Sequence, residues 1–136
     1  MTDSGRKRVL VVDDEATVGK SIRKALEREG YEIDIALSGE DALKMQEGKG
    51  YDVMLVDLMM PGMSGLDVLK SVKTAYPAVQ VIMITGYPTL KNTLQAMQIG
   101  AFDFLPKPFQ PADLRGLVAK ALQGPGLNGG PSGASG

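Results

Sequence analysis

Acidic residues directly follow two apolar segments that have the length of β-strands. The segment from Arg8 to Val12 precedes Asp13 and Asp14, and the segment from Val53 to Val56 precedes Asp57. An apolar segment of this length predicts a buried strand, so each acid is expected at the edge of the core. Burying a charge costs free energy unless something neutralises it. Taken alone, each acid is more typical of a simple cap on the following turn or helix.

Two further polar residues stand at the ends of predicted strands. Thr85 ends an apolar segment that begins at Val79, and Lys107 follows a short strand predicted from Ala101 to Leu105. In open parallel sheets the binding crevice lies beyond the carboxyl ends of the strands. The hydroxyl and the ammonium are therefore expected beside the three aspartates, although each alone is more typical of a strand end and a solvated lysine.

This combination of groups predicts chemistry on a phosphoryl group. Three crowded carboxylates repel one another, and either protonation or a bound cation relieves the repulsion. Oxygen ligands without His or Cys favour a hard ion, Mg²⁺ or Mn²⁺. Such an ion and Lys107 would neutralise phosphoryl oxygens, and Thr85 would supply a hydrogen bond. Asp57 is then placed to act as the nucleophile that forms an aspartyl phosphate.

Five helices are predicted to position these strand ends. Apolar residues recur at helical spacing after each strand, and Ser38 with Asp41 and Ser64 with Asp67 have the spacing of helix caps. The apolar positions are Val18, Ile22, Ala25 and Leu26; Ala42, Leu43 and Met45; Leu66, Leu69, Val72 and Tyr76; Leu90, Leu94 and Met97; and Leu114, Leu117, Val118, Ala121 and Leu122. Pro88 is expected in the first turn of the fourth helix.

The order of elements predicts an α/β fold, a doubly wound parallel sheet. Strand and helix alternate five times, and parallel neighbours need crossovers that cover both faces of the sheet. The segment from Tyr31 to Leu37 alternates apolar and polar residues, which indicates a half-exposed edge strand. The expected organisation is a flexible lead over residues 1–7, one domain over residues 8–123, and a disordered Gly/Pro/Ser-rich tail over residues 124–136. That tail is either a linker remnant or residues left from cloning.

Composition restricts the chemistry further. The chain has 136 residues, 43% of them hydrophobic, which suits one compact domain. The absence of Cys and His excludes disulfides, thiolate metal sites and imidazole catalysis. The net charge of -1 gives no reason to expect contact with nucleic acid or an anionic membrane. No segment has the length of a membrane span and the start lacks a signal peptide, so a soluble, cytoplasmic protein is expected.

The ordered set of motifs resembles the response-regulator receiver domain of two-component signalling. The matching residues are Asp13-Asp14, Asp57 with Met60-Pro61-Gly62, Thr85-Gly86 and Lys107-Pro108, and the resemblance spans residues 8–123. It implies the flavodoxin-like receiver fold, a five-stranded parallel sheet of order 2-1-3-4-5 with five helices. It also implies a phosphorylation-activated switch whose acceptor, Asp57, takes its phosphoryl group from a sensor histidine kinase. Such a domain catalyses only its own phosphorylation and dephosphorylation, so it is not a conventional enzyme.

The resemblance also implies a role for each site residue. Asp14 would bind Mg²⁺ (or Mn²⁺) directly, Asp13 would help to hold it, often through water, and Asp57 and the backbone carbonyl of Met59 would complete the protein ligands. Thr85 and Lys107 would contact the phosphoryl oxygens. Thr85 and the switch aromatic Phe104, which alone would be read as core, would relay the change. A cis peptide is expected before Pro108.

Partners follow from the same resemblance. The relay would end at the surface of the fourth helix, fifth strand and fifth helix and would control an output domain, a downstream protein or a phosphorylation-dependent homodimer. The kinase is expected to dock on the face that contains Thr17, Lys20, Arg23, Pro108 and Phe109. The segment from Gly100 to Phe109 is similar to the corresponding segment of receivers that precede ATPase-type transcriptional activators. This similarity implies a role in transcription regulation. Neither nucleic acid nor membrane is expected to contact this domain directly.

The sequence leaves two alternative functions open. A metal-dependent phosphatase or phosphotransferase with a nucleophilic Asp normally has a second acid two residues later, where this chain has Met59. A pseudo-receiver that is never phosphorylated is disfavoured because every chemical position is filled.

Met59 cannot orient water by hydrogen bonding and Tyr87 is bulky, which predicts slow hydrolysis of the phosphorylated form. The methionines at positions 59, 60 and 63 are otherwise expected to serve turn and core packing.

Overall fold

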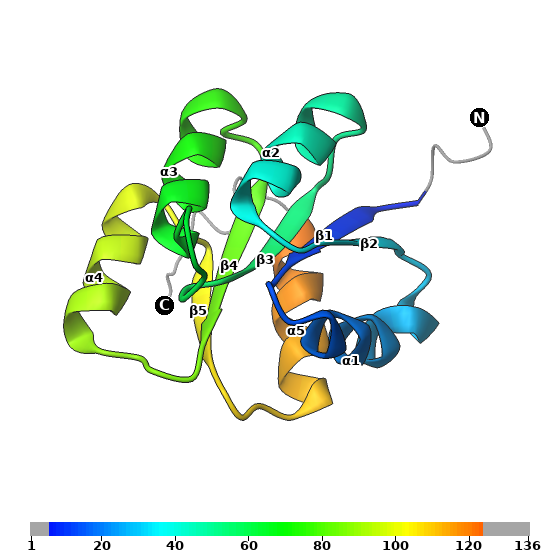
Figure 1. Ribbon diagram of the computed structural model, residues 1–136. Coiled ribbons are helices and arrows are strands. Elements are labelled where there is room, and N and C mark those ends of the chain that lie inside the picture. Colours follow the sequence, from blue (N-terminus) through cyan, green and yellow to red (C-terminus); the bar gives the residue numbers. More distant parts are fainter. Residues whose placement is uncertain (1–5, 124–136) are drawn as a thin grey trace.

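The chain folds into a five-stranded parallel sheet between two layers of helices (Figure 1). The computed structural model describes residues 6–123. The strands are β1 (Arg8–Val12), β2 (Glu32–Ala36), β3 (Val53–Asp57), β4 (Gln80–Thr85) and β5 (Asp103–Pro106). The helices are α1 (Ala16–Leu26), continued by a 3-10 turn (Glu27–Glu29), α2 (Gly39–Gly48), α3 (Gly65–Ala75), α4 (Leu90–Ile99) and α5 (Pro111–Leu122). The strand order β2-β1-β3-β4-β5 confirms the predicted fold.

Side-chain alternation on the strands divides the core into two layers. On β3, Met54 and Val56 pack with residues of α2, α3 and α4, whereas Val53 and Leu55 pack with residues of α1 and α5. Figure 1 shows the same division, with α1 and α5 on one face of the sheet and the other three helices on the opposite face. Because both faces of a central strand are covered, its sequence reads as a continuous apolar segment.

Local capping sets where the helices begin. The Ser38 hydroxyl accepts the N–H of Asp41 at 3.1 Å, and Ser64 and Asp67 form a reciprocal capping box, as their spacing predicted. Gly30 has a φ of 83°, a left-handed conformation that ends the first helical segment. Each helix therefore starts or stops within a few residues of a strand end, which keeps the loops at the sheet edge short.

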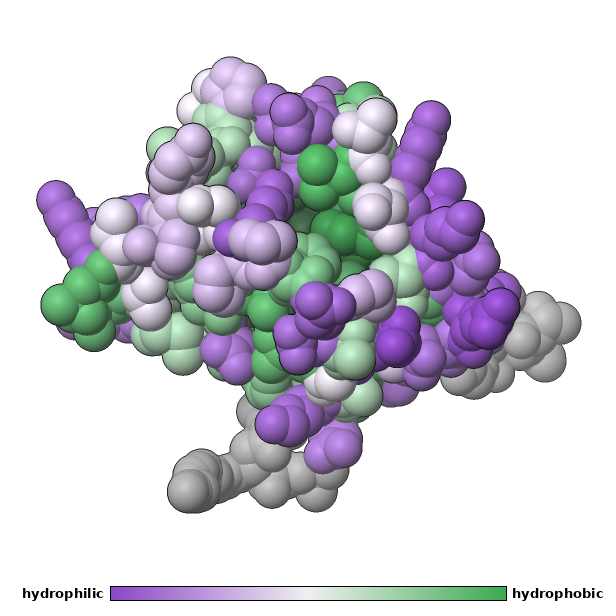
Figure 2. Space-filling view, turned by 90° about the horizontal axis from the view of Figure 1, so that it is seen from below, coloured by the Kyte–Doolittle hydropathy of each residue, from purple (hydrophilic) through white to green (hydrophobic). Residues whose placement is uncertain are grey.

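The sequence predicted the existence of α4 but neither its start nor its buried face. Thr89 caps α4 by accepting the N–H of Asn92 at 3.0 Å, so Pro88 lies before the helix and not in its first turn. The helix packs on the core through Ala96 and Ile99. The apolar residues that predicted it, Leu90, Leu94 and Met97, are instead exposed, and Leu90 is exposed by 76%. Figure 2 shows hydrophobic atoms at the left edge of the molecule, on the side where Figure 1 places α4.

Smaller differences concern boundaries. The last strand runs from Asp103 to Pro106, two residues later at its start than predicted. Of the predicted flexible lead, Arg6 and Lys7 are described, and Arg6 donates hydrogen bonds to the carbonyls of Gly30 and Tyr31. The remainder of the lead and the predicted tail over residues 124–136 lie outside the described residues. Within residues 6–123, no helix has the length and apolar character needed to cross a membrane.

Candidate functional site

The carboxyl ends of four strands form one pocket at the edge of the sheet. Its volume is about 320 Å³, and its lining is formed by Asp14, Glu15, Asp57, Met59, Thr85, Gly86, Tyr87 and Lys107. Figure 2 looks onto this edge, where hydrophilic residues surround more hydrophobic ones. Because β1 and β3 are adjacent in the sheet, residues that follow them in sequence end up side by side in space.

Three carboxylates lie close together at this pocket: Asp14 and Asp57 line it, and Asp13 is adjacent to them. One carboxylate oxygen from each of Asp13, Asp14 and Asp57 lies within 4.8 Å of the other two. Asp13 and Asp57 are buried and Asp14 is exposed. The backbone holds the two buried groups in place, because Asp13 accepts the N–H of Glu15 at 2.9 Å and Asp57 accepts the N–H of Met59 at 3.4 Å. The cluster predicted from the strand ends is confirmed.

Burial changes the acidity of the central aspartate. Desolvation is the largest cause that raises the pKa of Asp57, from 3.8 to about 6, and the charge of Asp13 adds to it. Lys107 and the N–H of Met59 oppose the shift but do not cancel it. The ionised form of Asp57 is therefore poorly compensated by protein groups, and a cation beside it would lower its free energy.

The donor set fits a hard divalent cation. The three carboxylates offer oxygen atoms only, and their separations allow them to share one ion together with water. One of the three is exposed, so an ion can keep part of its hydration shell, as Mg²⁺ does in most proteins. Mn²⁺ prefers the same ligand atoms.

Thr85 and Lys107 reach the same cluster from β4 and from the loop after β5. The Thr85 side chain is fully buried, and its hydroxyl oxygen accepts the N–H of Tyr87 at 3.0 Å. The Thr85 carbonyl accepts the N–H of Lys107 at 2.7 Å, which extends the pairing of the two strands by one residue. Lys107 Nζ lies 3.6 Å from Oδ2 of Asp13. The predicted cis peptide between Lys107 and Pro108 is present.

Phe104 lies on the same face of the sheet as Thr85. It is opposite Met83 in the β4–β5 register, and it packs, partly buried, against the core layer of α2, α3 and α4. Met83 faces that layer, and Thr85, two residues later, continues the alternation on the same side. The two predicted switch residues therefore share one face of neighbouring strands.

Sequence reasoning missed two residues at this site and misplaced one. Glu15 lines the pocket, and its only signal was adjacency to Asp14; Gly86, from the motif Thr85-Gly86, lines the pocket as well. A Cβ on Gly65 would collide with the carbonyl oxygen of Asp57 and lie 2.7 Å from Cα of Leu58, so only glycine allows the start of α3 to approach β3. Met59 is exposed at the pocket, so the prediction that it serves core packing is wrong. Its turn places its backbone against Asp57 and leaves the side chain outside.

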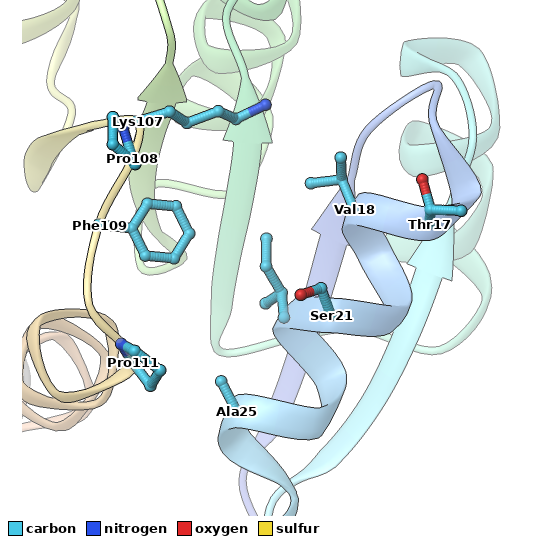
Figure 3. Close-up of a pocket in the computed structure, with 9 residues that line it drawn as sticks. Thr17, Val18, Ser21, Ala25, Lys107, Pro108, Phe109 and Pro111 are labelled. Atoms are coloured by element: carbon cyan, nitrogen blue, oxygen red, sulfur yellow. The ribbon is translucent and has the colours of Figure 1, made fainter.

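A larger groove lies beside the site, between α1 and the segment from Lys107 to Pro111 (Figure 3). Its volume is about 610 Å³, and it is lined by Thr17, Val18, Ser21, Ile22, Ala25, Lys107, Pro108, Phe109 and Pro111. Figure 3 shows the Phe109 ring facing α1 across the groove. Of the residues predicted for partner docking, Thr17, Pro108 and Phe109 line the groove. Lys20 and Arg23 are exposed elsewhere on α1, and Arg23 donates to the carbonyl of Ile33.

Comparison with known proteins gives a consistent assignment. The family model of the response regulator receiver domain matches residues 9–119. The transcriptional regulatory protein ResD of Bacillus subtilis is 38% identical over 122 residues, which are 90% of this chain and 50% of ResD. The DNA-binding transcriptional regulator NtrC of Proteus hauseri is 38% identical over 114 residues, 84% of this chain and 24% of NtrC.

Solved structures agree with the sequence comparisons. The CheY-like receiver domain protein of Methanospirillum hungatei superposes with a TM-score of 0.84 at 33% identity, covering 88% of this chain and 95% of that one. The chain thus spans nearly all of an isolated receiver domain, but only about half of ResD and about a quarter of NtrC.

Proposed function

This chain belongs to the response regulator receiver domain family of two-component signalling, and from that premise we propose that Asp57 accepts a phosphoryl group from a histidine kinase in a Mg²⁺-dependent reaction. One observation carries the proposal: the buried Asp57 carboxylate shares a pocket with two further carboxylates and with the Lys107 ammonium. Membership of the family supports phosphorylation-controlled signalling in general. The geometry of this site supports Asp57 as the acceptor and Thr85 and Phe104 as the relay.

Each residue has a definite part in the transfer. Asp13, Asp14, Asp57 and the carbonyl of Met59 would hold Mg²⁺, which supplies charge neutralisation at the phosphoryl oxygens. A carboxylate oxygen of Asp57 forms a bond to phosphorus while the bond from phosphorus to the donor's histidine nitrogen breaks. Lys107 and Thr85 contact phosphoryl oxygens and stabilise the negative charge that develops there.

The relay begins with a change of hydrogen bonding at Thr85. Its hydroxyl oxygen accepts the N–H of Tyr87, and its hydrogen would be donated to a phosphoryl oxygen once Asp57 is modified. Thr85 then moves toward the phosphoryl group, and space opens on the face of β4 and β5 that it shares with Phe104. An inward turn of Phe104 would alter the surface of α4, β5 and α5. The added charge at Asp57 would thus change side-chain packing on a distant surface.

The exposed side chains of α4 lie on that output surface. Leu90, Leu94 and Met97 are exposed, and an uncovered apolar stripe of this kind suits an output domain or a phosphorylation-dependent homodimer. The relatives are named as transcriptional regulators, and this chain matches only about half of ResD and about a quarter of NtrC, so we assign the downstream role to transcription. The similarity of Gly100 to Phe109 to receivers of ATPase-type activators favours an output domain of that type.

The groove between α1 and the segment from Lys107 to Pro111 is the proposed docking surface of the kinase. It opens next to the phosphoacceptor pocket, and Lys107 lines both. Its walls are apolar around Val18, Ile22 and Phe109, which suits a helix of the partner. We place this exchange in the cytoplasm, without direct contact of this domain with nucleic acid or membrane.

A phosphatase or phosphotransferase of another family is the alternative function, and the site disfavours it. The residue two beyond Asp57 is Met59, whose side chain cannot act as a general acid. A pseudo-receiver is disfavoured because the acid cluster, Thr85 and Lys107 are all present in one place. The domain therefore turns over no external substrate beyond its phosphodonor.

Incubation with a small phosphodonor and Mg²⁺ separates the three functions by intact mass. The wild type should gain one phosphoryl group and release it slowly, whereas Asp57→Ala should gain none. A phosphatase would instead release phosphate from the donor continuously, and a pseudo-receiver would show neither result.

A further inference from the structure

Met59 differs from most methionines of this protein in its exposure to solvent. It is 59% exposed, whereas Met54 and Met83 are fully buried and Met60 is nearly so. Met63 is partly buried against Gly39, where an added Cβ would lie 2.8 Å from its sulfur. Among the methionines within residues 6–123, only Met97 on α4 is comparably exposed, at 43%. An oxidant in solution therefore has direct access to the Met59 sulfur.

The Met59 side chain also occupies a sensitive position. It lines the pocket that contains Asp57, and its own N–H is bonded to the Asp57 carboxylate, which fixes its backbone beside the acceptor. Asp57 is buried in the pocket, while Met59 and Tyr87 are its most exposed apolar and aromatic lining residues. Water that attacks a phosphoryl group on Asp57 has to enter this pocket, which both exposed side chains line.

We propose that the Met59 thioether is a site of reversible oxidation by a peroxide, and that its sulfoxide shortens the lifetime of phosphorylated Asp57. The inference rests on the proposed phosphorylation of Asp57. In the oxidation, the O–O bond of hydrogen peroxide breaks, one oxygen bonds to sulfur, and the other leaves as water. Sulfur loses two electrons and the peroxide gains them. Reduction by a methionine sulfoxide reductase reverses the change: a thiol reductant supplies two electrons, the S–O bond breaks, and the oxygen leaves as water.

The sulfoxide adds a strong hydrogen-bond acceptor for water to the lining of the pocket. A thioether sulfur is a weak hydrogen-bond acceptor, whereas a sulfoxide oxygen is polar and strongly accepting. A water held by that oxygen would be positioned to attack phosphorus, forming an O–P bond as the bond from phosphorus to the Asp57 oxygen breaks. The products are the free carboxylate and inorganic phosphate. One added hydrogen bond in the transition state predicts a lifetime about three- to tenfold shorter.

The test uses the full chain treated with dilute hydrogen peroxide, which is removed before phosphorylation by a small donor and Mg²⁺. Peptide mass analysis confirms the oxidation of Met59, and intact mass follows the loss of the phosphoryl group. Met59→Leu cannot be oxidised at this position, Met97→Leu removes the other exposed sulfur, and Met59→Gln carries a polar group of similar shape without any oxidant. Each variant is compared with itself before and after treatment.

The proposal expects peroxide to shorten the lifetime in the wild type and in Met97→Leu, and not in Met59→Leu. Met59→Gln should decay faster than the untreated wild type, and sulfoxide reductases should restore the lifetime of the oxidised wild type. An unchanged lifetime with Met59 oxidised, an equal loss in Met59→Leu, or oxidation of buried methionines before Met59 would overturn it. If the untreated wild type gains no phosphoryl group at Asp57, the proposed function fails instead.

Discussion

Lys107 Nζ lies 3.6 Å from Oδ2 of Asp13, although the two residues follow strands that are not neighbours in the sheet. β3 and β4 separate β1 from β5, and Asp57 stands at the end of β3 between them. The pair therefore spans the pocket and places a cation and an anion around the acceptor. Its charges act on Asp57 in opposite directions, since Asp13 raises the pKa of Asp57 and Lys107 lowers it.

Replacement of this lysine tests its part in phosphoryl transfer. Lys107→Ala should reduce the rate of phosphorylation by a small donor about 100-fold, because one fixed charge that stabilises the phosphoryl oxygens is lost. The measurement is the initial rate of phosphoprotein formation at fixed Mg²⁺. Lys120→Ala, at an exposed position in the last turn of α5, is the control and should match the wild type. Equal rates for Lys107→Ala and the wild type would exclude the assigned role.

The raised pKa of Asp57 predicts a pH-dependent cost to folding. The folded-state pKa is about 6 and the ordinary value is 3.8, so the folded protein binds the proton more tightly. Stability is therefore lost as pH rises from about 4 to about 6, and the full cost remains above that range. Asp57→Asn removes the charge and should raise the free energy of unfolding at pH 7 by about 1 kcal/mol, after allowance for solvent screening.

Denaturant unfolding without Mg²⁺ at pH 4, 5, 6 and 7 measures this effect. The advantage of Asp57→Asn should shrink as pH falls below 6 and vanish near pH 4. Glu47→Gln, an exposed acid near the end of α2, serves as the matched control and should not reproduce the gain. A difference between Asp57→Asn and wild type that is constant with pH would contradict the raised pKa.

Two glycines provide a matched pair for the packing that supports the site. Gly65→Ala should destabilise the protein by about 2 kcal/mol, because its Cβ would collide with the backbone of Asp57 and Leu58. Gly116, within α5, has open space around the corresponding position, and Gly116→Ala should stabilise the protein by about 0.5 to 1 kcal/mol. Thermal unfolding of both variants checks the signs. Tolerance of Gly65→Ala would show that the start of α3 can move away from β3.

Met59 and Tyr87 predict slow hydrolysis of the phosphorylated form. The Met59 thioether cannot orient an attacking water as an amide would, and Tyr87 adds a bulky side chain at the pocket. Met59→Asn supplies an amide at this position. Its phosphorylated form should decay several times faster than that of the wild type, because the amide adds about one hydrogen bond in the transition state. The measurement is the decay of phosphoprotein after removal of the donor. A wild type that already decays as fast as Met59→Asn would refute the hypothesis.

The sequence predicts the fold and the site well because both depend on local patterns. Strand length, side-chain alternation and caps such as Ser64 with Asp67 establish the order of elements. A parallel sheet then brings strand ends together, which is why Asp13, Asp57 and Lys107 meet as predicted. The strand order itself came from the resemblance to receivers, since pairing between distant strands leaves no local pattern.

The predictions that failed concern which side chains point into the core, because tertiary packing decides their orientation. Leu90 and Leu94 predicted a helix correctly, but α4 packs through the smaller Ala96 and turns them outward. Met59 is chemically suited to the core, yet the turn after β3 directs its neighbour Met60 inward instead. Gly65 matters through a contact with backbone that no spacing rule reveals. In each case a tertiary contact decides which side chain turns inward, and the local pattern does not encode that contact.

The most direct test locates the phosphoryl group on the chain. Phosphorylation with a small donor, followed by borohydride reduction of the acyl phosphate and peptide mass analysis, identifies the modified aspartate. We expect one modified residue, Asp57, which is phosphorylated with Mg²⁺ and stays unmodified when a chelator is present from the start. Modification at Asp13 or Asp14 instead, or at Asp57 to the same extent without a divalent cation, would contradict it.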